Sequence, residues 1–271
     1  LRAGAGQLAP SHAGRPGGDI GSAVVALTGL APGWGPLVVS CTAPLGVAMD
    51  EPGLDLAGLL ATRVMRVLQA QGEDSVDKET DLPLPVAICP GGEAGWHWAA
   101  SCVMVDPDMA DLVGHRRRTR VMDSSWIGRA AARPWPVMLA SKTAYKDRMT
   151  PHEVRGWGLL RWRAVGDPGL MMRLLAPVVA LGKARGSGEG KVHSWRVETV
   201  DLPRRDWQGW IHVDSSGALL RPVPVECATR WGASEGWEEG MWGLRPPQTA
   251  HVTGLAVPVP SDPTGDDPWM L

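Results

Sequence analysis

The residues best suited to chemistry in this chain are cations grouped around a glycine-rich segment at positions 182–191. Four glycines fall within nine residues there, and Lys183, Arg185 and Lys191 accompany them. Glycine allows sharp turns and close approach of another molecule to the backbone. Three cations in the same segment indicate that the approaching molecule is an anion. We call residues 182–191 the glycine loop; a solvated loop without a ligand is the alternative interpretation.

The glycine loop does not match the phosphate-binding loop of nucleotide hydrolases. That motif requires glycine where the chain has Arg185, and serine or threonine where it has Val192. Its order is strand, loop, helix, which points a helix N-terminus at the phosphates. Here the loop follows a predicted helix C-terminus, whose dipole repels anions. We therefore expect backbone N–H groups and cationic side chains to bind any phosphate.

Two further cationic segments and one alternating strand add to the positive charge. Residues 115–120 read His-Arg-Arg-Arg-Thr-Arg, and residues 141–148 place three cations around the only tyrosine. Alternation within residues 155–165 puts Arg161 and Arg163 on one face of a strand. Such clusters indicate contact with a polyanion, although a solvated charged surface is the alternative. The candidate RNA-binding residues are Arg116, Arg117, Arg118, Arg120, Lys142, Tyr145, Lys146, Arg148, Arg161, Arg163, Lys183, Arg185, Gly186, Gly188, Gly190, Lys191 and His193.

The overall composition is that of a globular protein without a global basic signal. The net charge is −2 over 271 residues, so a nucleic-acid site must arise from local clustering. Many of the fourteen tryptophans are expected in the core, and a few could stack on bases. No apolar run is long enough for a membrane span, and we expect a soluble, cytoplasmic protein.

The cysteines show no metal-ligand spacing. Cys41, Cys89, Cys102 and Cys227 stand far apart in the chain, with no pair separated by two to four residues. We therefore expect four reduced, mostly buried thiols rather than a zinc site or disulfides. The sequence predicts no metal and no cofactor.

The elements that position these residues alternate between strands and helices. A strand is expected over residues 37–42, and a helix over 50–71 capped by Asp50 or Asp55, with Arg63 and Arg66 away from its apolar face. Extended runs follow at 83–89 and 95–105. A basic, irregular insertion then occupies about 106–150.

The second half of the core repeats this alternation around the glycine loop. After the strand at 155–165, Asp167 and Pro168 open a second helix that reaches Leu181, with a kink expected at Pro177. A strand at 192–200 follows the loop. The order βαββαβ predicts an α+β protein of the ferredoxin-like or RNA-recognition type, with both helices on one face of an antiparallel sheet.

The domain organisation follows from these elements. We expect a disordered leader at 1–20, the core at 21–200 and a β-rich C-terminal extension with a tail at 201–271. Within the extension, a hairpin over 207–213 and 218–225 and an extended run at 252–260 are predicted.

Several segments together resemble CRISPR-associated proteins of the RAMP superfamily. The central unit consists of WRAVGD at 162–167, paired leucines at 174–175, LGK at 181–183 and WRVE at 195–198. Weaker resemblances occur, in the same order as in the family, at 54–61, 220–224 and 244–247. The similarity spans about residues 37 to 260 and is strongest to the Cas-five-like subunit of type IV effector complexes. Ser187 or Glu189 stands where the family usually has an aromatic residue.

The resemblance implies a function in RNA-guided defence. A subunit of this kind is non-catalytic, binds the 5′ handle of the guide RNA and caps the backbone of the effector complex. The resemblance implies that the handle is bound through phosphate contacts and by stacking of bases on Trp157 or Trp195. Its expected partners are the guide RNA, the backbone and large subunits, and, indirectly or near the short motif that flanks the target, the target nucleic acid. No membrane partner is expected.

Two alternatives remain open at this stage. Tyr145, Lys146 and His152, or His193, supply the residue types for metal-independent cleavage of repeat RNA, in which a base activates a 2′-hydroxyl. Alternatively, the chain is another backbone subunit of the same complexes.

Overall fold

The computed structural model describes residues 32–48, 53–72, 82–91, 95–105, 110–120, 148–182, 189–233, 236–243 and 251–258. In 110–120, 148–156 and 251–254 the description is confined to the backbone. The predicted leader and the C-terminal tail lie outside these ranges.

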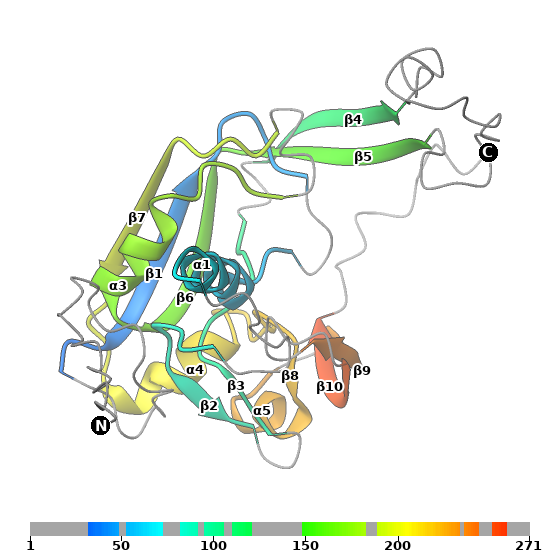
Figure 1. Ribbon diagram of the computed structural model, residues 1–271. Helices are drawn as coiled ribbons and strands as arrows, with labels where there is room; N and C mark the ends of the chain where they lie inside the picture. Colours follow the sequence, from blue (N-terminus) through cyan, green and yellow to red (C-terminus); the bar gives the residue numbers. More distant parts are fainter. Residues whose placement is uncertain are drawn as a thin grey trace, which may run out of the picture.

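The central element is an antiparallel sheet of β1 (Gly35–Thr42), β6 (Leu159–Gly166) and β7 (Ser194–Thr199) in the order β6-β1-β7 (Figure 1). Leu37, Val39 and Cys41 of β1 point to a buried face, as period-two alternation requires. The strands predicted at 37–42 and 192–200 are therefore confirmed.

A fourth, irregular segment lies along the other edge of β6. Ala100 bridges Ala164 and Met104 bridges Arg161, both antiparallel. The backbone N–H of Ser101 donates to the carbonyl of Arg163 at 2.8 Å. The segment follows a short hairpin of β2 (Ile88–Pro90) and β3 (Trp96–Trp98). Across the sheet the order is thus β7, β1, β6 and residues 99–104.

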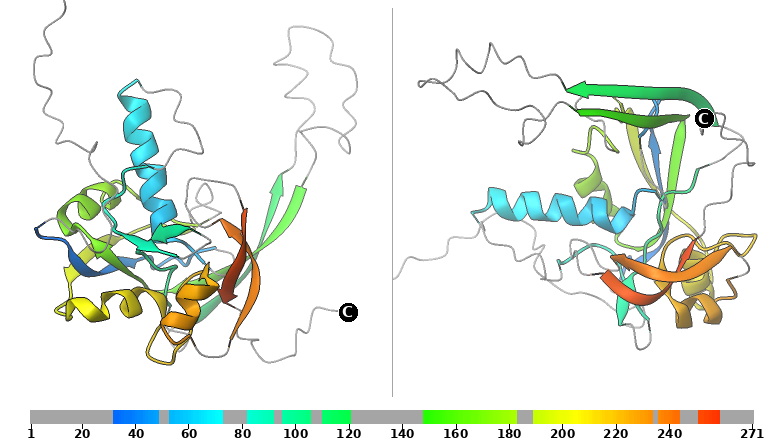
Figure 2. Two further views of the ribbon diagram at one scale, coloured as in Figure 1. Left: turned by 90° about the horizontal axis from the view of Figure 1, so that it is seen from below. Right: turned by 90° about the vertical axis from the view of Figure 1, so that its right-hand side faces the viewer.

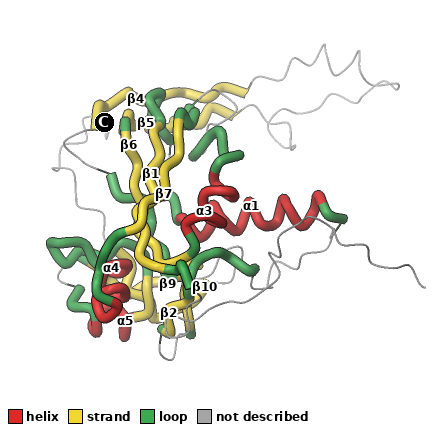
Figure 3. The backbone as a smooth tube through the Cα atoms, turned by 90° about the vertical axis from the view of Figure 1, so that its left-hand side faces the viewer, coloured by secondary structure: helices red, strands yellow, loops and turns green. Residues whose placement is uncertain are grey.

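Helices α1 (Leu56–Ala70) and α3 (Pro168–Leu175) cover one face of this sheet (Figure 3). Their caps are the predicted ones: Asp55 Oδ1 accepts from the N–H of Ala57 at 3.0 Å, and Asp167 Oδ1 from Leu170 at 2.8 Å. The buried residues of α1 end at Val64, and its C-terminal half projects beyond the sheet (Figure 2).

The second helix is shorter than predicted. α3 ends at Leu175, two residues before Pro177, rather than continuing to Leu181 with a kink. Proline has no N–H to donate and its ring clashes with the preceding turn, so termination is the less costly outcome. Residues 176–177 form a turn, and residues 178–182 then lead to the glycine loop, with Ala180 in an isolated bridge to Lys191.

The C-terminal region packs partly against the opposite face of the sheet. After a short 3-10 helix η4 (Arg204–Asp206), α4 (Trp207–His212) lies on that side (Figure 3). The guanidinium of Arg163 stacks 4.0 Å from the Trp210 ring centre and donates to the carbonyls of Trp210 and Val213 at 3.2 and 3.1 Å.

The hairpin predicted over 207–213 and 218–225 is wrong. Trp207, Trp210 and Ile211 follow helical spacing, and the segment is helical. Only the bridge between Val213 and Leu219 remains of the expected strand pairing.

A buried arginine fastens the extension to the core. Arg221, 2% exposed, donates to the carbonyls of Trp98 and Ala100 at 3.0 and 2.8 Å. Its other terminal nitrogen lies 3.7 Å from the carboxylate of Asp55, the cap of α1. Burial raises the pKa of Asp55, and the Arg221 charge acts in the opposite direction. The extension therefore forms part of the same body as the core.

The remaining strands form a second sheet and a long ribbon. β8 (Val223–Pro224), β9 (Trp237–Gly243) and β10 (His251–Pro258) pair in the order β8-β10-β9, with α5 (Val225–Arg230) after β8. The ribbon consists of β4 (Ala110–Arg120) and β5 (Arg148–Trp157) and projects from the sheet (Figures 1 and 2).

These strands correct two expectations and leave the fold class intact. Both ends of the insertion predicted to be irregular are extended, because residues 110–120 pair with residues 148–157 across the ribbon. The strand predicted over 155–165 is divided at Gly158 into β5 and β6. The extension contains short helices as well as strands. The chain is an α+β protein, and no helix in its described part has the length and apolarity needed to cross a membrane.

Candidate functional site

The glycine loop is closed at its base by a narrow neck, formed by residues 180–182 and 189–191. Ala180 bridges Lys191, and the N–H of Leu181 donates to the carbonyl of Gly190 at 2.8 Å. Gly182 and Gly190 have φ values of +75° and +69°, which side chains rarely adopt. A Cβ on Gly190 would lie 2.0 Å from the carbonyl oxygen of Leu181. These two glycines are therefore required by the neck itself.

A groove of about 580 Å³ adjoins the neck and separates it from α1. Residues 177–182 form one wall, and one face of α1 forms the other. Arg63 and Arg66 stand on that face one turn apart, so their side chains are neighbours. Arg66 is exposed and Arg63 half-buried, and Arg63 Nε has no hydrogen-bond partner among the described residues. We call this space the loop groove.

A second, smaller groove of about 340 Å³ lies on the uncovered part of the opposite sheet face. The strand register places Ser40 between Arg161 and Arg196 in a single row. Arg161 is exposed, whereas Arg196 lies 3.6 Å from the carboxylate of Glu198. The surface is therefore less cationic than its arginines suggest.

The structure distributes the described RNA-binding candidates over four places. Lys191 and His193 are exposed where the neck meets β7, and Arg161 lines the smaller groove. Arg163 is half-buried, and its bonds to the carbonyls of Trp210 and Val213 hold α4 in place. Of the other candidates, the ribbon carries Arg116, Arg117, Arg118, Arg120 and Arg148. Lys142, Tyr145, Lys146, Lys183, Arg185, Gly186 and Gly188 lie outside the described residues.

The two tryptophans expected to stack on bases are turned into the protein. Trp157 is 7% exposed. Trp195 is half-buried, donates its indole N–H to the carbonyl of Val178 at 2.9 Å and lies against Trp162 with 5.7 Å between ring centres. Conversely, sequence reasoning placed Arg63 and Arg66 away from any site; their spacing of three residues on α1 was the available signal.

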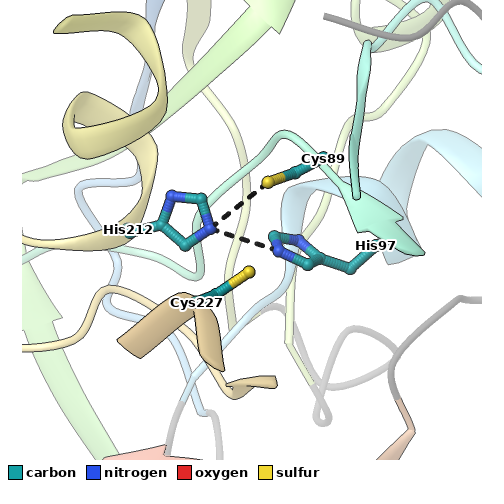
Figure 4. A group of neighbouring side chains, drawn as sticks. All are labelled: Cys89, His97, His212 and Cys227. Atoms are coloured by element: carbon teal, nitrogen blue, oxygen red, sulfur yellow. Dashed lines mark hydrogen bonds between the residues drawn. The ribbon is translucent and has the colours of Figure 1, made fainter. Parts of the chain in front are cut away.

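A second cluster, of two cysteines and two histidines, was missed entirely from the sequence. Cys89 of β2 and His97 of β3 are directly opposed in the hairpin register, while His212 ends α4 and Cys227 lies in α5. All four side chains converge on one point (Figure 4), with their potential ligand atoms within 4.8 Å of one another. None is more than 2% exposed. We call these residues the Cys–His cluster.

Hydrogen bonds fix the orientation of both imidazoles. His97 Nδ1 lies 3.0 Å from the carbonyl oxygen of Trp98, and His212 Nδ1 bonds to the carbonyl oxygen of Gln208. A carbonyl oxygen only accepts, so each Nδ1 carries a hydrogen. Each Nε2 points to the centre of the cluster, 3.2 Å from the other, and His212 Nε2 lies 3.6 Å from Cys89 Sγ.

Burial and mutual contacts set the charge of the cluster. Burial lowers the pKa of His97 to about 4, so its imidazole is neutral near pH 7. The hydrogen bond between the two thiols raises the pKa of Cys89 and lowers that of Cys227. Of the two thiols, Cys227 is therefore the one that gives up its proton more readily.

No protein-family model matches this chain, and no curated protein matches it either.

Proposed function

We propose that this protein is a non-catalytic RNA-binding subunit of a ribonucleoprotein, and that the RNA backbone lies in the loop groove against the glycine loop. The observation that carries the proposal is the position of that groove. It joins a loop whose neck is built from positive-φ glycines to a helix face bearing Arg63 and Arg66. Cations and glycine backbone thus meet in one concave surface.

The chemistry of the loop groove suits a phosphate backbone better than a compact ligand. Guanidinium groups bind phosphate oxygens in a fork, and phosphate contacts supply affinity without sequence choice. In the sequence, Lys183 comes directly after Gly182, which lines the groove, and Arg185 follows two residues later. A single strand laid there would be held through its backbone.

The arrangement of the main sheet supports a finer assignment to a ferredoxin-like RAMP fold. The order β7, β1, β6 and residues 99–104, with α1 and α3 on one face, is the one expected of βαββαβ proteins. The glycine loop then falls between the second helix and the last strand. This is the position that the resemblance to Cas-five-like subunits implies for RNA contact.

In this assignment the protein binds the 5′ handle of a guide RNA in a type IV CRISPR effector complex and caps its backbone. The ribbon, with the cationic run 115–120 on β4, is an arm long enough to reach RNA beyond the loop groove or a neighbouring subunit. Choice of target would reside in base pairing between guide and target rather than in this chain.

The test is binding of the full chain to a short, fluorescently labelled single-stranded RNA, measured by anisotropy. We expect saturable binding that weakens when Arg63 and Arg66 are both replaced by alanine. Binding equal to that of an unrelated protein of similar charge would refute RNA binding. Strong binding that the double variant leaves unchanged would move the site away from the loop groove.

A further inference from the structure

We infer that Cys89, His97, His212 and Cys227 form a structural zinc site that joins the β2–β3 hairpin to α4 and α5. The inference concerns the architecture of the protein and is independent of RNA binding. It starts from four side chains of the types that zinc prefers, brought together from four separate elements (Figure 4).

The separations between the four side chains are those of zinc ligands. In a tetrahedral site with Zn–N near 2.0–2.1 Å and Zn–S near 2.3 Å, two nitrogens lie about 3.3 Å apart, and a nitrogen and a sulfur about 3.6 Å apart. Here the two Nε2 atoms are 3.2 Å apart, and His212 Nε2 is 3.6 Å from Cys89 Sγ. All ligand atoms fall within 4.8 Å, so small movements would complete the tetrahedron.

The imidazole orientations favour a cation over a hydrogen bond between the rings. Both Nδ1 atoms donate to backbone carbonyls, so in neutral rings both Nε2 atoms present lone pairs to each other. Two lone pairs at 3.2 Å repel, and a hydrogen bond would need a buried imidazolium. A metal ion accepts both lone pairs, and Nδ1–H bonded to a carbonyl is the usual outer partner of a zinc-bound histidine.

Charge balance and burial select a closed, structural site. Zinc binding releases the thiol protons, and Zn²⁺ with two thiolates and two neutral imidazoles has no net charge. A neutral complex avoids the large cost of burying an isolated ion. Four protein ligands, each no more than 2% exposed, leave no open position for water or substrate. Two sulfurs and two nitrogens in tetrahedral geometry suit zinc rather than magnesium or calcium.

The position of the site gives it a structural task. Cys89 and His97 come from the hairpin beside the main sheet, whereas His212 and Cys227 follow more than a hundred residues later, after β7. α4 and α5 are helices of six residues each, too short to be stable alone. A shared metal ion would hold both against the hairpin.

The main competing states are a pair of hydrogen-bonded thiols and a disulfide between Cys89 and Cys227. Both sulfurs lie 3.8 Å from the carbonyl oxygen of Pro90, so one weak acceptor serves two thiols. In that arrangement only the thiols could donate to the Nε2 atoms, as the 3.6 Å contact between Cys89 Sγ and His212 Nε2 allows, and the two Nε2 atoms would still face each other at 3.2 Å. A disulfide would remove two ligands, and it is directly measurable.

The experiment measures metal in the full chain purified under reducing conditions without chelator. We expect one zinc ion per chain by elemental analysis and X-ray absorption with two sulfur and two nitrogen neighbours. After exchange with Co²⁺ we expect the intense visible bands of a tetrahedral thiolate site. Cys227→Ser and His97→Gln should reduce zinc to trace amounts. Cys102→Ser should retain it, because Cys102 is buried but outside the cluster.

Measurements on the unaltered chain keep the inference testable if those variants fail to fold. Incubation with a zinc chelator should lower the midpoint of thermal unfolding, and added Zn²⁺ should restore it. The inference would be overturned if the metal-free chain took up no Zn²⁺ and, after addition of Co²⁺, showed no thiolate-to-cobalt absorption. So would a Cys89–Cys227 disulfide in the reduced preparation, or full zinc content in Cys227→Ser.

Discussion

Replacing Arg63 and Arg66 with alanine should weaken RNA binding and reduce its dependence on salt. Both side chains line the loop groove, and each is expected to neutralise one phosphate. For single strands the slope of log affinity against log salt is about −0.7 per neutralised phosphate. The double variant should therefore have a slope shallower by about 1.4. Between about 50 and about 200 mM salt, the affinity advantage of the unaltered chain should shrink about 7-fold.

The assay is a series of anisotropy titrations with one short single-stranded RNA at four or more salt concentrations. The matched control replaces Arg204 and Arg205 of the short helix η4 with alanine, which removes the same amount of positive charge as the double variant. Arg205 is 85% exposed. The control should keep the slope of the unaltered chain. Equal slopes for all three proteins would refute the placement of phosphates in the loop groove, and an equal loss in both variants would indicate only a net-charge effect.

Three other perturbations test separate parts of the account. Alanine at arginines 116–118 of the ribbon should reduce the salt slope by up to about 2 in the same titrations, and an unchanged slope would remove the ribbon from the RNA site. The purified chain should leave a labelled repeat RNA intact; cleavage that disappears in His152→Ala or His193→Ala would contradict a non-catalytic role. Gly190→Ala should lower the free energy of unfolding in urea by more than Gly72→Ala. Both substitutions cost about 1–2 kcal/mol because the residue has a positive φ, but only at Gly190 would the new Cβ lie 2.0 Å from a carbonyl oxygen. Equal losses of stability would show that the neck tolerates a side chain.

Features governed by local rules were predictable from the sequence. Asp55 and Asp167 cap their helices as expected, because a side-chain acceptor beside the first free N–H groups is a local arrangement. The strands at 37–42 and 192–200 and the α+β class follow from short-range patterns. The end of α3 before Pro177 was also predictable, because a proline inside a helical pattern either ends the helix or kinks it. The kink was predicted, and the structure shows the end.

Features that depend on tertiary contacts were not predictable in the same way. Arg161 and Arg163 share a strand face, but only the position of α4 shows that Arg163 donates hydrogen bonds within the protein, to the carbonyls of Trp210 and Val213. The Cys–His cluster was not recognised from the spacing of the cysteines, because its four residues come from four separate elements. Its one local signal was the pairing of Cys89 with His97 across a glycine-containing turn, which becomes visible once the hairpin register is known.

The loop groove shows the same limitation. The glycine loop drew attention to its own cations, whereas Arg63 and Arg66 lie over a hundred residues earlier in the sequence and were predicted only to lie away from the apolar face of α1. The return of residues 177–182 past α1 converts that side into a groove wall. A helix face can be assigned to solvent or to a site only when its neighbours in space are known.

The central claim is that RNA contacts the glycine loop and the adjoining face of α1. The most direct measurement is ultraviolet crosslinking of the chain to its bound RNA, followed by mass spectrometry of the crosslinked peptides. The account predicts crosslinks in peptides covering α1 and residues 177–191, to nucleotides at one end of the RNA. An absence of crosslinks above background, or crosslinks confined to surfaces away from the loop groove, would contradict it.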